Sequence, residues 1–101
     1  QAHSASLAAR LPNFLNVPLS HGIRSRSGAY VFPRDVHVAE DKDGKRHVAF
    51  VQYRVGGDNR LAYVYDPTDT LTAGKRDYLF GFGLLGQVDS LGNHWYRCYF
   101  T

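Results

Sequence analysis

The stretch Arg46–Tyr65 reads RHVAFVQYRVGGDNRLAYVY, and it decides the fold. Two runs rich in β-branched and aromatic residues flank the segment Gly56–Asn59. Glycine and asparagine supply the positive φ angles that a tight turn needs, so this pattern predicts a β-hairpin. We expect the remaining segments to pair on the two sides of this hairpin.

Composition favours one soluble globular domain. The chain has 101 residues, too few for a second hydrophobic core, and its 44% hydrophobic and 21% charged residues are ordinary for a soluble protein. The formal net charge is +3 and the isoelectric point about 9.2. This balance fits either an anionic partner such as nucleic acid or a solvated surface rich in arginine.

The single cysteine, Cys98, excludes an internal disulfide, and no Cys/His spacing predicts a metal site. We expect a buried core thiol, no metal and no cofactor. No run is long and apolar enough to cross a membrane, so no membrane partner is expected. The chain begins at Gln1, as a processed secreted protein or a cut domain would. A secreted or extracellular location is the prediction, with a cytosolic domain fragment as the alternative.

Residues 1–28 predict a helix and a loop. Ser4 or Ser6 is placed to cap a short helix that runs to Leu11, and Pro12 predicts a stop or a kink. Residues 20–28 are polar and glycine-flanked, which is typical of a loop.

Residues 29–101 predict an antiparallel sheet. The fold class is therefore α+β, with the short N-terminal helix packed on a twisted, curved sheet of about five strands in meander order. Glycines in the fourth strand indicate a bulge or strong curvature. The expected strands are Ala29–Glu40, Arg46–Val55, Arg60–Asp66, Asp77–Val88 and His94–Thr101.

The register of the first hairpin determines which side chains share a face. Asp43-Gly44 as a two-residue turn places Val38 opposite Ala49. Val36 then lies opposite Val51 on the expected core face. The opposite, polar face carries His37, Phe50, Gln52 and Arg54.

The second turn decides where Arg60 points. A three-residue loop, 57–59, places Arg60 on the polar face, whereas a two-residue loop turns it toward the core. We favour the three-residue loop, because arginine prefers the polar side. His94 begins the last strand and is expected to reach the same face from its rim. A solvated sheet face would also collect such residues.

Three motifs follow one another along the chain: Gln52-Tyr-Arg-Val, Asn59-Arg60-Leu-Ala-Tyr, and Gly92-Asn93-His94-Trp-Tyr. Together they resemble the small microbial guanyl-preferring ribonucleases, the barnase and T1 group. That resemblance implies a helix packed on a curved antiparallel sheet.

The resemblance also implies roles for individual residues. Arg60 would bind the phosphate with Arg54 and Gln52 nearby, and His94 would be the catalytic general acid. His37 matches a second catalytic histidine on the preceding strand. Gln52, however, stands where the family has its glutamate base, and an amide cannot take a proton from a ribose hydroxyl.

Whether the chain is an enzyme therefore stays open at this point. The resemblance implies either a ribonuclease with a rearranged base or a protein that binds RNA or a protein partner without cutting, and we favour binding. Inactive ribonuclease-like effectors of plant-pathogenic fungi are similar in general plan. The alternative is a secreted effector, inhibitor or immunity-type interaction module with no nucleic-acid role. Such a module would use Tyr78–Gly86 as an exposed edge strand. A small SH3-like or oligonucleotide-binding barrel would also accommodate the strands.

Overall fold

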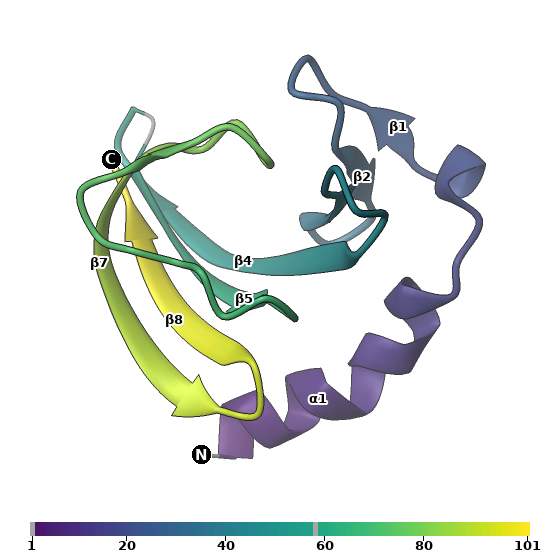
Figure 1. Cartoon of the computed structure of the whole chain (residues 1–101), viewed down its shortest axis with the longest axis horizontal. Coiled ribbons are helices and arrows are strands. Elements are labelled where there is room, and N and C mark those ends of the chain that lie inside the picture. The colour runs from purple at the N-terminus through teal and green to yellow at the C-terminus, as the bar shows by residue number, and fades with distance from the viewer. Residues whose placement is uncertain (1, 58) are drawn as a thin grey trace.

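The computed structural model describes residues 2–57 and 59–101, and within these it shows one α-helix and a single antiparallel sheet (Figure 1). The α+β class with a curved sheet is confirmed, but the sheet has eight strands rather than about five. The elements are α1 (Ala2–Leu15), a short 3-10 helix η1 (Leu19–His21), β1 (Ile23–Arg24), β2 (Tyr30–Phe32), β3 (Val36–Glu40), β4 (Arg46–Val55), β5 (Asn59–Tyr65), β6 (Arg76–Asp77), β7 (Gly83–Gly92) and β8 (Trp95–Phe100).

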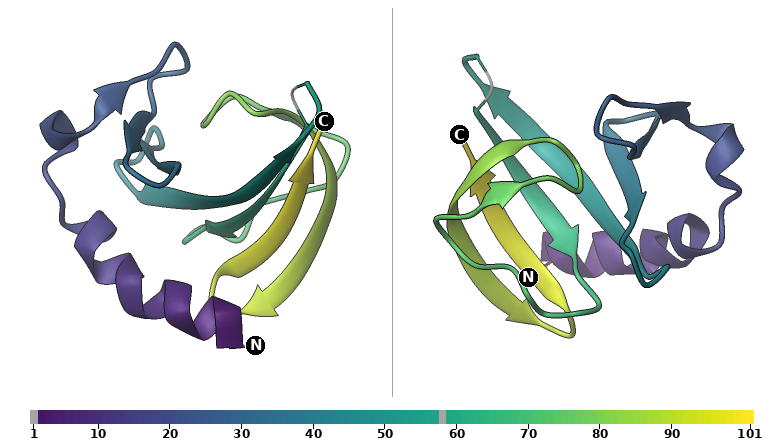
Figure 2. Two further views of the ribbon diagram at one scale, coloured as in Figure 1. Left: turned by 180° about the vertical axis from the view of Figure 1, so that it is seen from behind. Right: turned by 45° about the horizontal axis from the view of Figure 1, so that its top comes forward.

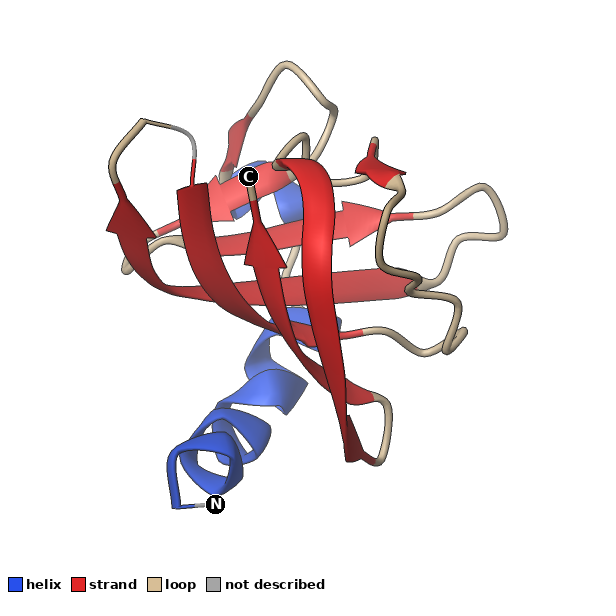
Figure 3. Cartoon of the chain, turned by 90° about the vertical axis from the view of Figure 1, so that its left-hand side faces the viewer, coloured by secondary structure: helices blue, strands red, loops and turns tan. Residues whose placement is uncertain are grey.

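The strands lie in the order β1-β2-β3-β4-β5-β8-β7-β6. The predicted meander order is therefore wrong at one place, because β8 inserts between β5 and β7. The sheet curls strongly (Figure 3), and its two ends approach each other. The hydroxyl of Ser27, in the β1–β2 turn, donates a hydrogen bond to the carbonyl of Phe80, near β6, at 3.0 Å.

Helix α1 is longer than predicted, because it continues through Pro12 to Leu15. Ser4 and Ser6 lie inside the helix, so their predicted role as caps is wrong. The predicted stop at Pro12 is also wrong, since the helix ends at Leu15. Just after this end, the side-chain amide of Asn16 donates a hydrogen bond to the Pro12 carbonyl at 3.1 Å. No helix in the described part of the chain is long and apolar enough to span a membrane.

Both faces of the sheet are covered with apolar side chains. Helix α1 lies along the convex face (Figures 1 and 2), where Leu7 and Leu11, one helical turn apart, are buried against the strands. The convex layer comprises Leu7, Leu11, Phe32, Val36, Val38, Val48, Phe50 and Trp95. The concave layer comprises Ala29, Ala39, Ala49, Val51, Ala62, Val64, Phe80, Phe82, Leu85, Cys98 and Phe100.

The predicted strand Ala29–Glu40 is in fact a hairpin of β2 and β3. Pro33, Arg34 and Asp35 form its turn, and Phe32 pairs with Val36. Arg34 and Asp35 have φ angles of 66° and 58°, in the left-handed region. Proline supplies no ladder donor, which favours a turn at this point over a continuous strand.

The register between β3 and β4 differs by one residue from the prediction. Val38 pairs with Val48, because the turn has three residues, 42–44, rather than two. Gly44, with φ of 79°, donates its N–H to the Asp41 carbonyl at 2.9 Å. A slip of one residue exchanges the faces of a strand. His37 therefore lies on the concave face, opposite Ala49.

The central hairpin of β4 and β5 is confirmed, with Val55 opposite Asn59. Its turn includes Asp58, which lies outside the described residues. Further along, Val51 pairs with Ala62 and Tyr53 with Leu61, so that Gln52 is the extra residue of a β-bulge. The predicted loop 57–59, which would place Gly56 opposite Arg60 and Gln52 opposite Val64, is therefore wrong, since Arg60 pairs with Arg54 and Val64 with Ala49. Beyond the bulge, Arg54 pairs with Arg60.

Candidate functional site

A pocket of about 280 Å³ lies between the β1–β2 turn and the concave face, and we call it the mouth pocket. His37 of β3, Arg60 of β5 and Phe82 line it, together with Arg26 and Ser27 from the β1–β2 turn. It adjoins a second pocket of about 500 Å³, which shares Arg60 and Phe82. This second pocket is also lined by Arg76 and Tyr78.

The histidine of the mouth pocket is buried and held by a carboxylate. His37 is 6% exposed, and its Nε2 lies 2.7 Å from Asp35 Oδ1. Arg54 binds the same carboxylate through two hydrogen bonds, from Nε at 3.1 Å and from Nη2 at 3.0 Å. Asp35 lies in the β2–β3 turn with a left-handed φ of 58°, outside the strand, so alternation along β3 gives no signal for it.

These contacts fix the protonation of His37. Burial lowers the pKa of His37 below its ordinary value, although the hydrogen bond that His37 donates to Asp35 opposes this shift. Burial alone would raise the pKa of Asp35, but the hydrogen bonds from His37 and Arg54 outweigh it and the pKa is lowered. A neutral His37 therefore donates its Nε2–H to an ionised Asp35. Its Nδ1 is then an unprotonated acceptor, and it is buried without a hydrogen-bond partner among the described residues.

Phe82 joins His37 to Arg60. The imidazole lies edge-on to the Phe82 ring, with centroids 4.8 Å apart. The guanidinium carbon of Arg60 lies 4.3 Å from the centre of the same ring, a cation–π geometry. The sequence offers one signal for Phe82, since it stands between Gly81 and Gly83 in the glycine-interrupted run.

Residues 77–83 form a strap that holds Phe82 in place. Asp77 Oδ1 accepts the N–H groups of Leu79 at 2.9 Å and Phe80 at 3.1 Å, and Oδ2 accepts that of Phe82 at 3.0 Å. Gly81 has φ of 78°, and a Cβ there would lie 3.0 Å from the Cβ of Ser27. The strap therefore needs glycine where it meets the β1–β2 turn.

The structure thus brings His37, Arg54 and Arg60 together, as the sequence predicted. Gln52 does not line the mouth pocket in the described part of the chain, since it occupies the bulge of β4. Its role in binding stays a prediction.

His94 does not join this cluster. Arg60 pairs with Phe100 at one end of β5, whereas His94 contacts Tyr65 at the other, with ring centroids 5.9 Å apart. Five residue steps along a strand span about 17 Å. The expectation of one cluster with His94 is therefore wrong, and its catalytic role stays a prediction.

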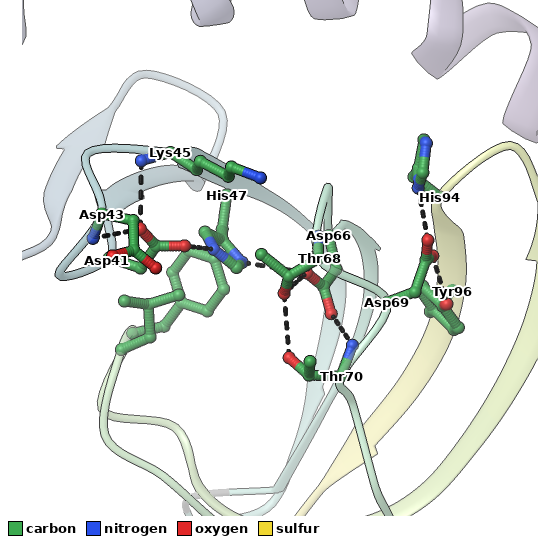
Figure 4. Close-up of polar contacts among 12 residues, drawn as sticks. Asp41, Asp43, Lys45, His47, Asp66, Thr68, Asp69, Thr70, His94 and Tyr96 are labelled. Carbon is green, nitrogen blue, oxygen red and sulfur yellow. Dashed lines mark hydrogen bonds and ion pairs between the residues drawn. The ribbon is translucent and has the colours of Figure 1, made fainter.

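His94 belongs instead to a separate exposed network (Figure 4). Its Nδ1 lies 2.7 Å from Asp69 Oδ2, and the Tyr96 hydroxyl donates to Asp69 Oδ1 at 2.5 Å. The hydrogen bond to Asp69 raises the pKa of Tyr96 to about 12. This network connects the loop after β5 to the β7–β8 turn.

A second buried histidine, His47, was not among the predicted site residues. Its Nε2 lies 2.8 Å from Asp41 Oδ2, and its Nδ1 lies 3.4 Å from Asp66 Oδ1 (Figure 4). Asp66 also accepts hydrogen bonds from Thr68 and Thr70. Burial alone would raise the pKa of Asp66, but these bonds outweigh it and the pKa is lowered. His47 thus links the β3–β4 turn, through Asp41, to the loop after β5, through Asp66.

Among residues 2–57 and 59–101, no group of three or more His, Cys, Asp or Glu side chains is arranged to hold a metal ion. No family model, curated protein or solved structure matches this chain.

Proposed function

We propose that this chain is a ribonuclease-like protein that binds single-stranded RNA in the mouth pocket without cleaving it. The observation that carries the proposal is the buried Nδ1 acceptor of His37, which shares the pocket and the Phe82 ring with Arg60. An acceptor beside a cation matches a ligand that offers a hydroxyl next to a phosphate.

The charge around the two pockets supports a phosphate ligand. Arg26, Arg60 and Arg76 line them, and arginine suits bidentate binding of phosphate oxygens. The two neighbouring carboxylates are already engaged, Asp35 by Arg54 and His37, and Asp77 by backbone N–H groups.

The neutral side chains support RNA as the polymer. A ribose 2′-hydroxyl can donate to His37 Nδ1, and DNA lacks this group. Tyr78, at the edge of the adjoining pocket, is 79% exposed. Its ring can stack on a base, as aromatic side chains do in single-strand binding proteins.

Binding is favoured over cleavage because cleavage needs a proton donor for the leaving oxygen as well as a base. His37 has the geometry of a base, but no second histidine lines either pocket in the described part of the chain. Gln52 supplies no carboxylate. An extracellular location and an effector role stay predictions.

The test is fluorescence anisotropy with a labelled single-stranded RNA of about twelve nucleotides. We expect DNA of the same sequence and RNA with 2′-O-methyl groups to bind about ten-fold more weakly, since one hydrogen bond to Nδ1 is lost. Because three arginines would contact the RNA phosphate backbone, the logarithm of RNA affinity should fall with the logarithm of salt concentration at a slope of about −2. Gel analysis of the RNA should show no cleavage.

Two variants locate the binding. Arg60→Gln should weaken RNA binding about ten-fold, since an arginine–phosphate contact is lost. Arg97→Gln is the matched control, because Arg97 pairs with Asp89 on exposed strands outside the mouth pocket. Equal loss in both variants, or no RNA binding by the unmodified protein, contradicts the proposal.

A second candidate is a protein-interaction module that accepts a strand from its partner. The supporting observation is the edge of β7. Strand β6 pairs with Gly83 and Leu84, Gly74 and Lys75 form hydrogen bonds with Leu85, and no other strand of the described residues pairs with the rest of this edge. The predicted edge strand Tyr78–Gly86 is placed wrongly along the sequence. Residues 78–82 form the strap, and the exposed edge belongs to β7, which begins at Gly83. Binding of one protein partner that is abolished by proline at Gln87, with no affinity for RNA, would favour this candidate.

A further inference from the structure

A cavity of about 220 Å³ lies inside the curled sheet, apart from the mouth pocket, and we call it the interior cavity. It adjoins a wider vestibule of about 850 Å³. Four residues line both spaces and so form the boundary between them: His47, Thr70, Tyr78 and Leu79. Figure 4 shows the His47 and Thr70 side chains and their neighbours Thr68 and Asp66.

The floor of the interior cavity is apolar and buried. Val64, Leu85 and Phe100 line it, and their exposed fractions are 1%, 3% and 1%. Such a floor offers water no hydrogen-bond partner, and cavities of this kind bind apolar groups. The part of a ligand that enters deepest must therefore be hydrocarbon.

The rim of the cavity is polar, and its acidic groups are already satisfied. Asp66 accepts hydrogen bonds from Thr68 and Thr70, and Asp77 accepts three backbone N–H groups of the strap. Lys75 and Arg76 also line the rim and are exposed. Neither side chain forms a hydrogen bond or ion pair with the described residues. Lys75 and Arg76 are therefore the charged side chains of the rim that a ligand can pair with.

We propose that the interior cavity binds one small amphipathic anion, with its hydrocarbon tail on the floor and its carboxylate at Lys75 and Arg76. At about 30 Å³ per water-sized group, the cavity's volume of about 220 Å³ accommodates a tail of about seven carbons. Octanoate has a tail of this length and is the probe of choice.

The experiment is isothermal titration of the unmodified protein with octanoate. We expect one site with a dissociation constant on the order of 0.1–1 mM, from the usual efficiency of small ligands. Octylamine should bind at least ten-fold more weakly, because its ammonium group faces Lys75 and Arg76. Affinity should rise from butyrate to octanoate and then stop rising. Equal binding of octylamine, or an affinity that still rises at dodecanoate, would overturn the proposal.

Two pairs of variants place the ligand. Leu85→Phe fills the cavity and should abolish octanoate binding, while Leu84→Phe on the same strand should not, because Leu84 is exposed and does not line the cavity. Should Leu85→Phe fail to fold, the chain-length series on the unmodified protein decides the same point.

The second pair tests the carboxylate. Lys75→Gln should weaken octanoate binding three- to ten-fold and leave octylamine no weaker. Lys45→Gln removes the same charge from an exposed turn outside the cavity, so it should change neither affinity. Arg76 is not used, because it also lines the pocket next to the mouth pocket. Equal losses in the two lysine variants would refute the assignment of the head group.

Discussion

Replacing Asp77 by asparagine tests whether the strap positions the mouth pocket. The Asp77 carboxylate accepts three backbone N–H groups, from Leu79, Phe80 and Phe82. Asparagine keeps one oxygen and turns its NH₂ group toward at least one of these donors. At least one charge-assisted hydrogen bond is lost, at about 1.5–3 kcal/mol. Because Asp77 is half-buried, we expect the free energy of unfolding to fall by about 2 kcal/mol.

Urea denaturation measures this change. For a domain of this size, m is about 2 kcal/mol/M, so the midpoint should fall by about 1 M with m unchanged. The variant stays folded without urea, since domains of this kind have about 5–15 kcal/mol of stability. Its affinity for RNA should nevertheless fall about ten-fold, because Phe82, which contacts both His37 and Arg60, loses its backbone anchor.

Asp66→Asn is the matched control. Asp66 also accepts three hydrogen bonds from its own loop and is 1% exposed, so stability should fall at least as much. Asp66 does not line the mouth pocket, and RNA affinity should therefore stay within about two-fold of the unmodified protein. Unchanged RNA affinity in Asp77→Asn, or equal losses in both variants, would refute the reasoning.

Three further predictions concern titratable groups. The pKa of His37 is lower in the folded protein than its ordinary value, so the unfolded chain binds a proton first as pH falls. The free energy of unfolding should therefore decline below about pH 6.5. In His37→Phe, the urea midpoint should no longer fall with pH for this reason. Tyr96, with a pKa of about 12, should ionise at higher pH than an ordinary tyrosine when absorbance in the ultraviolet is followed against pH. Asp69→Asn should return the pKa of Tyr96 toward about 10. An absorbance titration that Asp69→Asn leaves unchanged would contradict the role of this hydrogen bond. Burial raises the pKa of the Cys98 thiol to about 12, so a thiol reagent should label it only as fast as the chain unfolds, with rates that follow the unfolded fraction in urea.

The central hairpin and the last strand were predictable from the sequence, because their signals are local. Gly56 and Gly57 supply positive φ at the turn, and apolar runs flank it. The extra strands were not predictable in the same way. β1 and β6 have two residues each, too few for any periodicity to show.

The face of His37 was missed for a physical reason. Along β3 and the first half of β4, both faces of the sheet are covered, so Val36, His37, Val38 and Ala39 are all buried. Such a strand shows no alternation between polar and apolar residues, and alternation is what fixes register in a sequence. The turn at Gly44 then decides the register, and it has three residues rather than two.

The cluster of His37, Arg54 and Arg60 was nevertheless predicted, because two errors cancelled. The one-residue slip at the first turn moved His37 to the concave face. The bulge at Gln52 shifts the register of β4 by one residue after Val51, which brings Arg54 to the same carboxylate as His37. A bulge leaves no clear signal in a single sequence, so neither change could be seen in advance.

Backbone strain gives an independent reason to regard the mouth pocket as functional. Arg34 and Asp35 adopt φ angles of 66° and 58°, a region that glycine occupies at lower cost. Glycine at position 35 would relieve this cost but would remove the carboxylate that binds both His37 and Arg54. Without it, no contact seen in the described residues would hold the Nε2–H tautomer of His37, and the buried Nδ1 would no longer be fixed as an acceptor. The strained Asp35 therefore joins the β2–β3 turn to Arg54 of β4 and also sets the tautomer of His37 on which the proposed RNA contact depends.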